Sequence, residues 1–493
     1  MPYESYEPVI GLEIHLQLAT QSKAFCSDDA SFGGEPNTHV SAISLGHPGT
    51  LPRLNKRQVE YAVRLGLALG SRINLRNCFD RKNYFYTDLP KGYQITQDRL
   101  PVCVGGSMEL QMDGYRRTVR IHHLHMEEDA GKSIHDLSPR HSMIDLNRAG
   151  VPLLEIVSEP DLRSGEEVDA FMTAMRQLAR YLGISDGNMQ EGSMRCDVNV
   201  SVRKKGETLL GERCEIKNVN SMRFARQAIE FEVKRQVDLL ENGQEIIRST
   251  LNFNPATGET SPMRDKESAH DYRYFPDPDL PPVVFTQQWV DEVADSLPEL
   301  PQTLFKRFVN EFDLPEYDAR LLTQERETAA FFEKTARVCS QTEVGSPLGV
   351  GGRGKAAANL FINKISPWLA EMGSSIEDFP VSAEQLAAYL QLIESGQVSA
   401  SIANQRLFPE LVKSPDTSPL ELAQSLNLLQ SADSDFLEKI VDEVLAANPY
   451  KVAEYRKGKK GLIGFFMGEV MRASKGKAEP KATNELVARK LAG

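Results

Sequence analysis

A strict alternation of apolar and polar residues runs through Ile10-Gly11-Leu12-Glu13-Ile14-His15-Leu16-Gln17-Leu18. Successive side chains of a β-strand point to opposite faces of its sheet, so we expect the apolar set to be buried and Glu13 and His15 to share the other face. The same alternation occurs at residues 195–203 and 213–217, which flank a Lys-Lys-Gly turn and form a predicted hairpin. These segments predict a sheet with one buried face and one polar face.

The polar face of this predicted sheet carries side chains of a restricted kind. Asp197 in the second segment and Glu215 and Lys217 in the third join Glu13 and His15. A solvated outer face is the competing interpretation for any single strand. Short acidic side chains with a histidine and a lysine in three such strands favour a metal-dependent catalytic site, because clustered carboxylates suit a Mg²⁺ ion that bridges nucleotide phosphates.

Two further stretches fit the same site. Residues 125–133, His-Met-Glu-Glu-Asp-Ala-Gly-Lys-Ser, place three acids before a Gly-Lys-Ser turn, and Glu155 interrupts the apolar run 151–156. A buried carboxylate at position 155 has to be paired or metal-bound to offset the free energy of its desolvation. We therefore expect both stretches to reach the polar face.

Composition limits the class of protein. The 493 residues, 41% hydrophobic and 26% charged, indicate a globular chain of roughly two to four domains. No apolar run approaches the roughly 20 residues of a membrane span, and the first residues are acidic where a signal peptide would be basic, so we expect a cytoplasmic protein without a membrane span. The six cysteines show no C-x-x-C spacing and are expected to be free thiols.

The charge distribution is uneven. The net charge of −12 argues against an extensive nucleic-acid-binding surface, but basic residues outnumber acidic ones from Lys451 onward. A basic end on an acidic protein favours a polyanionic partner bound by that end. A solubilising terminal helix is the alternative.

The hydrophobic period changes along the chain. Up to about residue 284, short alternating runs are broken by Gly, Pro and Asn, with helices predicted to begin at Asn55 and Ser164. Prolines then punctuate the chain, and beyond residue 295 the apolar residues recur with a helical period. We predict an α+β fold: a catalytic cradle domain with a mixed or antiparallel sheet, followed by all-helical domains. The predicted domains are 1–294, 295–405 and 406–493, the last boundary lying anywhere from 400 to 420.

Common nucleotide-binding signatures do not explain the site. Residues 349–356 nearly match a phosphate-binding loop, but they lack the Ser or Thr hydroxyl that holds Mg²⁺ and follow no apolar strand. The chain has no G-x-S-x-G elbow, dinucleotide fingerprint or kinase D-F-G set. Any ATP site must be built differently.

Several long motifs are similar to those of one family. They are Val-Ile-Gly-Leu-Glu-Ile-His at 9–15, Asp-Arg-Lys-Asn-Tyr-Phe-Tyr at 80–86, His-Met-Glu-Glu-Asp-Ala-Gly-Lys-Ser at 125–133 and Asp-Tyr-Arg-Tyr-Phe-Pro at 271–276. With these motifs the sequence resembles the B subunit of the aspartyl/glutamyl-tRNA amidotransferases, the GatB family. The resemblance runs from end to end, and so many long motifs in order are highly specific.

The resemblance implies an ATP-dependent ligase reaction on a mischarged tRNA. ATP phosphorylates the side-chain carboxylate of Glu on tRNA(Gln), of Asp on tRNA(Asn), or of both, and ammonia then displaces phosphate. It also implies a heterotrimer in which the A subunit, an amidase, supplies ammonia through a tunnel while a small third protein, the C subunit, secures the pair. The chain has no recognisable glutaminase nucleophile of its own, which agrees with this division.

The resemblance also implies which residues bind the metal. The expected ligands are Glu13, His15, Glu128 and Glu155. Histidine is an unusual ligand for Mg²⁺, so Mn²⁺ is the alternative metal.

Other residues are expected to contact the reactants. Asp197, Glu215 and Lys217 would be the catalytic residues that orient ATP, a second metal or the acyl acceptor. The expected nucleotide contacts are Lys217, Asn218 and Arg148. The expected contacts of the tRNA 3′ end, for which core packing is the alternative, are Tyr84, Tyr86, Tyr272 and Tyr274. The predicted domain 406–493 resembles the family's YqeY-like domain, whose basic end would contact the tRNA body.

One departure from the family concerns zinc. Many relatives carry C-x-C and C-x-x-C pairs that bind structural zinc after the first strand, whereas this chain keeps only Cys26 and has Ser41 and Ser44 in the second pair's region. We therefore expect no zinc. Two other functions compete with the amidotransferase interpretation: a stand-alone ATP-dependent carboxylate-amine ligase and a non-catalytic tRNA-binding scaffold.

Overall fold

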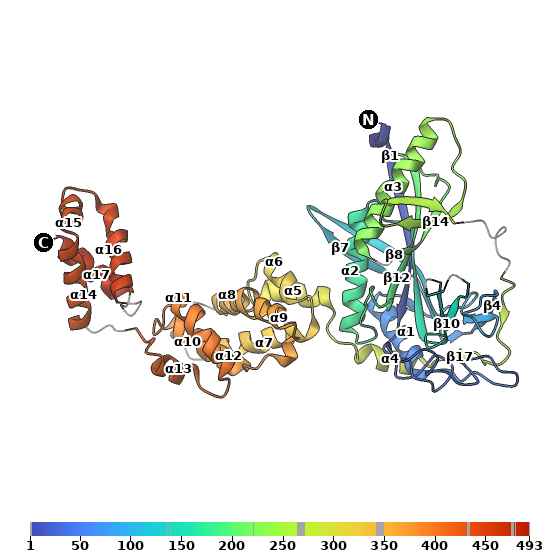
Figure 1. Cartoon of the computed structure of the whole chain (residues 1–493), viewed down its shortest axis with the longest axis horizontal. Coiled ribbons are helices and arrows are strands. Elements are labelled where there is room, and N and C mark those ends of the chain that lie inside the picture. Colours follow the sequence, from blue (N-terminus) through green and yellow to red (C-terminus); the bar gives the residue numbers. More distant parts are fainter. Residues whose placement is uncertain are drawn as a thin grey trace. The chain divides into compact units, whose positions relative to one another are not determined.

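The computed structural model describes residues 2–492 apart from 136, 139, 220, 264–271, 342–349, 431–433, 475–477 and 479. The chain divides into two compact units, Met1–Leu300 and Pro301–Gly493, and each is described by itself. The predicted fold class is confirmed: a mixed sheet with a few helices forms the first unit, and helices form the described elements of the second (Figure 1).

A ten-stranded sheet is the centre of the first unit. Its strands are β1 (Tyr6–Gln17), β2 (Arg72–Ile73), β6 (Cys103–Val104), β7 (Ser107–Met112), β8 (Tyr115–Glu128), β11 (Pro152–Ser158), β12 (Met194–Lys204), β13 (Cys214–Val219), β14 (Ser249–Asn254) and β15 (Glu259–Pro262). The order is β15-β14-β13-β12-β1-β11-β8-β6-β2, with β7 paired to β8. Only β13 and β14 are parallel among these pairs. The predicted hairpin is confirmed, since β12 and β13 pair antiparallel.

Three smaller sheets complete the β-structure. They contain β9 (Lys132–Ile134) with β10 (Met143–Asp145), β4 (Asp80–Asn83) between β5 (Tyr93–Thr96) and β16 (Phe275–Pro276), and β3 (Arg76–Asn77) with β17 (Val283–Val284). The pairing of β16 with β4 joins segments that are almost two hundred positions apart in the sequence. It brings the motif at 80–86 beside the described part of the motif at 271–276.

The helices of the first unit are η1 (Pro2–Ser5), α1 (Lys56–Ala68), α2 (Gly165–Tyr181), α3 (Met222–Glu241) and α4 (Gln287–Asp295). The predicted helix starts are confirmed, because the side chains of Asn55 and Ser164 accept hydrogen bonds from the first turns of α1 and α2. Helices α2 and α3 lie side by side (Figure 1).

The predicted alternation decides which face of the sheet is buried. Leu12 and Ile14 of β1 and Val198 and Val200 of β12 are at most 1% exposed. They belong to one hydrophobic core with the apolar residues of α1, α2 and α3, such as Phe171. The opposite face of these strands carries the polar side chains, so one row of residues stabilises the fold while the other is available for chemistry.

The helices of the second unit are α5 (Pro301–Glu311), α6 (Glu316–Leu322), α7 (Arg326–Gln341), α8 (Val350–Leu360), η2 (Phe361–Ile365), α9 (Ser366–Met372), η3 (Ile376–Asp378), α10 (Ala383–Glu394), α11 (Ala400–Ile402), η4 (Ala403–Leu407), α12 (Phe408–Lys413), α13 (Pro419–Ser425), α14 (Ser434–Ala447), α15 (Pro449–Arg456), η5 (Lys460–Leu462), α16 (Ile463–Ala473) and α17 (Pro480–Ala492). Residues 350–356 of the phosphate-loop-like run lie in α8, and Gly349 lies outside the described residues.

Two hydrophobic features organise this unit. The predicted boundary at 405/406 falls inside a continuous helical run, η4 followed by α12, and Phe408 packs against Tyr389 of α10 with ring centroids 6.0 Å apart. A separate core begins at Leu437 and includes Phe466 and Val487. We call residues 434–492 the tail.

Among the described residues, no helix combines the length and the hydropathy needed to cross a membrane.

Candidate active site

The polar face of the large sheet is built from residues that lie opposite one another in neighbouring strands. His15 of β1 pairs with Glu155 of β11, which in turn pairs with His125 of β8. On the other side of β1, Glu13 pairs with Asp197 of β12. Opposite residues of an antiparallel ladder point to the same face, with Cβ atoms about 5 Å apart. These side chains therefore form one continuous polar surface over four strands.

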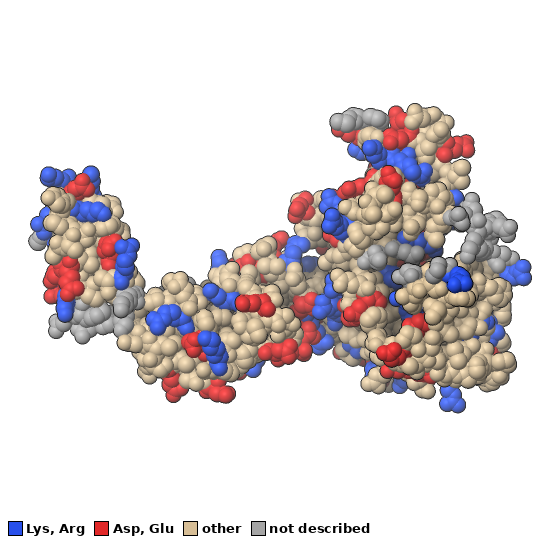
Figure 2. Space-filling model, in the orientation of Figure 1, with Lys and Arg blue, Asp and Glu red and all other residues tan. Residues whose placement is uncertain are grey.

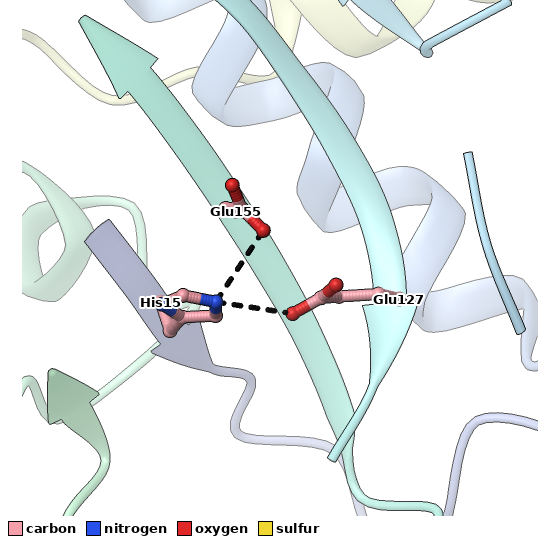
Figure 3. Close-up of side chains that lie close together, drawn as sticks. All are labelled: His15, Glu127 and Glu155. Atoms are coloured by element: carbon pink, nitrogen blue, oxygen red, sulfur yellow. Dashed lines mark ion pairs between the residues drawn. The ribbon is translucent and has the colours of Figure 1, made fainter. Parts of the chain in front are cut away.

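His15, Glu127 and Glu155 point toward one another (Figure 3). The Nε2 of His15 lies 3.3 Å from Oε2 of Glu155 and 3.5 Å from Oε1 of Glu127. One ligand atom of each residue lies within 4.8 Å of the others. Within the described part of the chain, this is the one group of three or more such side chains that is placed to hold a metal ion. We call it the metal-site cluster.

His125 contacts the metal-site cluster from the β8 side. Its Nε2 lies 3.4 Å from Oε2 of Glu155 and 3.6 Å from Oε2 of Glu127. The carboxylate of Glu155 therefore lies between the imidazole rings of His125 and His15. The sequence expectation that a carboxylate at 155 must be paired is confirmed by these contacts.

The charges of this cluster stabilise one another. Burial lowers the pKa of each histidine, but the carboxylates of Glu155 and Glu127 outweigh it and raise the pKa of His15 to about 9 and that of His125 to about 10. Burial raises the pKa of Glu155, but His125 and His15 outweigh burial and hold this pKa well below its usual value. Glu155 is thus an ionised acceptor between two cationic rings.

A lysine lies beside two further acids on the same face. The Nζ of Lys217 is 3.2 Å from Oε1 of Glu215 and 3.8 Å from Oδ2 of Asp197. Burial lowers the pKa of Lys217, but Glu215 and Asp197 outweigh it, so the pKa is raised and the ammonium persists. Glu13 accepts a hydrogen bond from Nδ2 of Asn199 at 3.0 Å. Its pKa is raised, first by burial and then by repulsion from the neighbouring carboxylates.

Glu128 is not part of the metal-site cluster. Its carboxylate contacts Nζ of Lys91 and accepts a hydrogen bond from the backbone N–H of Ile95 at 2.9 Å. Side chains alternate along β8, so Glu127 shares the polar face with His125, and its neighbour Glu128 does not.

Arg148 supports the turn that follows β8. It donates hydrogen bonds to the carbonyl oxygens of Ala130 and Gly131, at 3.0 and 2.7 Å. Within the same turn, Asp129 accepts a hydrogen bond from Arg195 at 2.7 Å and one from Gln17 at 2.8 Å. The guanidinium of Arg148 therefore binds backbone carbonyl oxygens beside the cluster. The side chain of Asn218, the remaining predicted nucleotide contact, lies outside the described residues.

The predicted tyrosines form one aromatic group. The ring centroid of Tyr84 is 5.8 Å from that of Tyr86 and 6.1 Å from that of Tyr272, and the centroid of Tyr272 is 5.9 Å from that of Tyr274. The Nζ of Lys82 lies 4.8 Å from the ring centroid of Tyr272. Burial opposes a charge on Lys82, but Tyr274 and the acids Glu127 and Glu155 raise its pKa. The aromatic group therefore adjoins the metal-site cluster.

A pocket of about 200 Å³ opens where the cluster and the aromatic group meet. Its lining residues are His15, Lys82, Tyr84, Gln94, Glu127, Asp129, Ala130, Leu153 and Arg195. A larger, mainly apolar pocket of about 330 Å³ lies at the start of α2 and contains none of the predicted site residues. The smaller pocket is thus lined by two members of the metal-site cluster, His15 and Glu127, and by one tyrosine of the aromatic group, Tyr84.

Comparison with known proteins identifies the family. A family model described as the GatB/GatE catalytic domain matches residues 8–291, and one described as the GatB domain matches residues 347–491. The chain belongs to the GatB family. It is 49% identical to the B subunit of the aspartyl/glutamyl-tRNA(Asn/Gln) amidotransferase of Geobacter sulfurreducens, over 99% of this chain and 100% of the relative. The same protein of Geotalea daltonii is 49% identical over 99% of this chain and all of the relative, and that of Thermodesulfovibrio yellowstonii 46% identical over 98% of each.

Four residues of the GatB site were not among the predicted site residues, although two of them lie in the stretch 125–133 that was expected to reach the polar face. His125 and Glu127 alternate along β8 with Leu124 and Met126, which are buried in the core. This alternation is the signal in the sequence that assigns His125 and Glu127 to the polar face. Lys82 and Arg195 reach the pocket as well. Arg195 begins the alternating segment 195–203, where it has the same parity as Asp197, so the sequence also contained a signal for it.

The segment that contains Cys26, Ser41 and Ser44 is held together by hydrogen bonds. The Sγ of Cys26 lies 3.5 Å from Oγ of Ser44. The carboxylate of Asp28 accepts hydrogen bonds from Oγ of Ser44 and from the backbone N–H of Ser41, the latter at 2.9 Å. The absence of zinc stays a prediction.

The pair between buried Asp129 and partly exposed Arg195 is expected to stabilise the GatB active site. Replacing Asp129 by Asn removes the charged partner that Arg195 contacts at 2.7 Å, which should destabilise the folded state by about 1–3 kcal/mol. Hydrogen exchange of the β8 and β12 peptides in the full chain measures the loss. The matched control Glu230→Gln alters an exposed i,i+4 pair on α3 and should leave exchange unchanged. Equal protection in Asp129→Asn and in the unaltered chain would contradict the assignment.

Proposed function

We propose that this chain is the part of a tRNA-dependent amidotransferase that activates the side-chain carboxylate of Glu-tRNA(Gln), Asp-tRNA(Asn) or both with ATP and forms the amide with ammonia. The observation that supports this most is the continuous polar face on which the metal-site cluster adjoins Lys217, Glu215 and Asp197, which we call the Lys217 group. It agrees with the names of the close relatives, which are aspartyl/glutamyl-tRNA(Asn/Gln) amidotransferase B subunits.

The metal-site cluster fits a divalent cation. Ligand atoms about 2.1 Å from a metal are about 3.0–3.4 Å apart. The contacts of His15 with Glu155 and Glu127, at 3.3 and 3.5 Å, are close to this range, and all three ligand atoms lie within 4.8 Å of one another. The two carboxylates and one imidazole suit Mg²⁺ with Mn²⁺ as the alternative. His15, Glu127 and Glu155 would hold the ion, with Glu13 at its border, and His15 would release its Nε2 proton to bind it. When bound, the ion supplies charge neutralisation for the transferred phosphoryl group.

Lys217 is proposed to bind the phosphates of ATP. Its ammonium is held by Glu215 and Asp197 and stays charged, so it can neutralise the transferred phosphoryl group, for which positioning and charge are the main requirements. Lys82, which lines the pocket, is proposed to act similarly. We propose that Arg148 acts on nucleotide binding by holding the turn at 130–131, and that Asn218 next to Lys217 completes the nucleotide contacts.

The aromatic group is proposed to receive the 3′ end of the tRNA. Tyr86 is half-exposed and Tyr274 partly exposed, while the adjoining Phe85 is almost fully exposed at 88%. Unpaired bases stack on exposed aromatic rings, each worth about 1–3 kcal/mol. Because Tyr84 lines the pocket, stacking on its neighbours would place the aminoacyl group beside the metal-site cluster.

Ammonia is proposed to come from partner proteins. The reaction needs a nucleophilic amine, and the sequence contains no recognisable glutaminase nucleophile. We infer a heterotrimer in which this chain assembles with an amidase, the A subunit, together with a small third protein, the C subunit. We also infer that the complex is cytoplasmic, as expected for an enzyme that acts on aminoacyl-tRNA.

Neutralising either of two carboxylates that lie opposite each other on the polar face, Glu13 of β1 or Asp197 of β12, should abolish amide formation. We expect Glu13→Gln and Asp197→Asn to lower kcat by at least about 100-fold, since both remove a fixed charge from the activation site. The dissociation constant for tRNA should stay unchanged, because neither residue is in the aromatic group or the tail. The measurement is Gln-tRNA or Asn-tRNA formation by the assembled complex, with tRNA binding measured in parallel. The control Glu212→Gln lies in the exposed loop between β12 and β13.

The same assay separates the competing functions. If the chain were a non-catalytic scaffold, both variants would form amide at the unaltered rate. If it were a stand-alone carboxylate-amine ligase, ADP release would not depend on mischarged tRNA. Under the proposed function, ADP release requires the aminoacylated tRNA.

The tail is proposed to contact the tRNA body. On the face seen in Figure 2, Lys and Arg gather at the end of the tail that carries α15, and acidic residues lie near α14. Part of the basic charge is paired internally, as in the contact of Lys490 with Asp442 at 2.6 Å. Lys475 and Lys477 of the basic terminal motif lie outside the described residues. Among the described residues of the tail, Lys457 and Lys460 are exposed and belong to its basic surface.

Removing the tail should weaken tRNA binding. A chain that ends at residue 430 retains α13 and lacks the separate core of the tail, and we expect a higher KM for tRNA and a weaker salt dependence.

Lys457→Gln in the full chain should lower the salt slope by roughly one if it contacts one phosphate. Lys413→Gln, an exposed lysine of α12, is the matched control. An unchanged KM after truncation would show that the tail does not bind tRNA.

A further inference from the structure

Three histidines of β8 connect the metal-site cluster with the protein surface. The Nδ1 of His125 lies 3.1 Å from Nε2 of His123, and Nδ1 of His123 lies 2.7 Å from Nδ1 of His122. Exposure falls along this series: His122 is exposed, His123 is partly buried and His125 is buried. We call these residues the histidine series.

A β-bulge makes the series contiguous. Val157 of β11 pairs with His123, but the next residue, Ser158, pairs with Ile121, so His122 is skipped in the ladder. In a regular strand, neighbouring residues point to opposite faces, whereas a bulge re-aims the side chain of the extra residue. This explains how the consecutive residues His122 and His123 bring their ring nitrogens within hydrogen-bond distance.

One arrangement of ring protons satisfies both contacts. In this arrangement the Nδ1–H of His125 donates to Nε2 of His123, and the Nδ1–H of His123 donates to Nδ1 of His122. The rings of His123 and His125 are also nearly parallel, with an interplanar angle of 16° and centroids 5.1 Å apart. Both contacts restrain the ring of His125 on the side away from the cluster. Its Nε2 is thereby kept toward Glu155 and Glu127.

We propose that His123, supported by His122, is a positioning residue of the metal site. It fixes the ring of His125, which in turn fixes the carboxylates of Glu127 and Glu155 in the arrangement that receives a divalent cation. The inference rests on the proposed metal site of this chain. Partners in the second layer around a metal orient the ligands, and losing one typically costs about 10- to 100-fold in metal affinity.

Mn²⁺ binding to the full, metal-free chain tests this role without measuring activity. Free Mn²⁺ is measured by electron paramagnetic resonance as the metal is titrated into the unaltered chain and its variants. We expect His123→Leu to weaken binding about 10- to 100-fold. His123→Gln should stay within about threefold of the unaltered chain, because the Gln carbonyl can accept the Nδ1–H of His125. His141→Leu, an exposed histidine outside the series, is the matched control and should not change binding.

The outcomes separate the two proposals. If the unaltered chain binds no Mn²⁺, the metal site fails and this inference fails with it. If the unaltered chain and His123→Leu bind equally well, the metal site stands and the role of His123 is refuted. Equal weakening in His123→Leu and His123→Gln would also refute it, because it would indicate a packing role that the accepting group does not rescue. Should His123→Leu not fold, His123→Asn, whose shorter side chain cannot reach His125, takes its place.

Discussion

The carboxylate of Glu155 between the imidazoles of His15 and His125 is the interaction on which the site depends. An isolated ionised carboxylate at this depth would cost several kcal/mol in desolvation, and the two rings with their raised pKa values offset that cost. The two histidines come from strands directly beside β11. The register that pairs these strands therefore also determines which charges meet at the site. A slip of one residue would move Glu155 to the apolar face.

The two faces of the sheet divide the work of the chain. One face supplies the hydrophobic core shared with α1, α2 and α3, and its close packing leaves little freedom for β1 and β12 to move. The other face carries the metal-site cluster and the Lys217 group on the same rigid strands. Rigid elements hold catalytic groups more accurately than loops do. The aromatic group depends on the pairing of β16 with β4, which is a shorter and more exposed connection.

Sequence reasoning worked where a period of two decided the geometry. The alternation in β1, β12 and β13 was sufficient to assign Glu13, His15, Asp197, Glu215 and Lys217 to one face. It was not sufficient in β8, where acids follow one another at 127 and 128, and only the parity relative to buried Leu124 and Met126 separates them. Lys82 was missed because it lies in a separate small sheet, where it pairs with Gln94 of β5, and no alternation in the sequence shows that both residues reach the pocket.

The most direct test of the proposed carboxylate activation is the fate of its oxygen. Glu-tRNA(Gln) or Asp-tRNA(Asn) labelled with ¹⁸O in the side-chain carboxylate is converted by the assembled complex with ATP and glutamine, and the inorganic phosphate is analysed by mass spectrometry. Phosphorylation of the carboxylate followed by attack of ammonia transfers one labelled oxygen to each phosphate released. Amide formation with unlabelled phosphate would contradict the account.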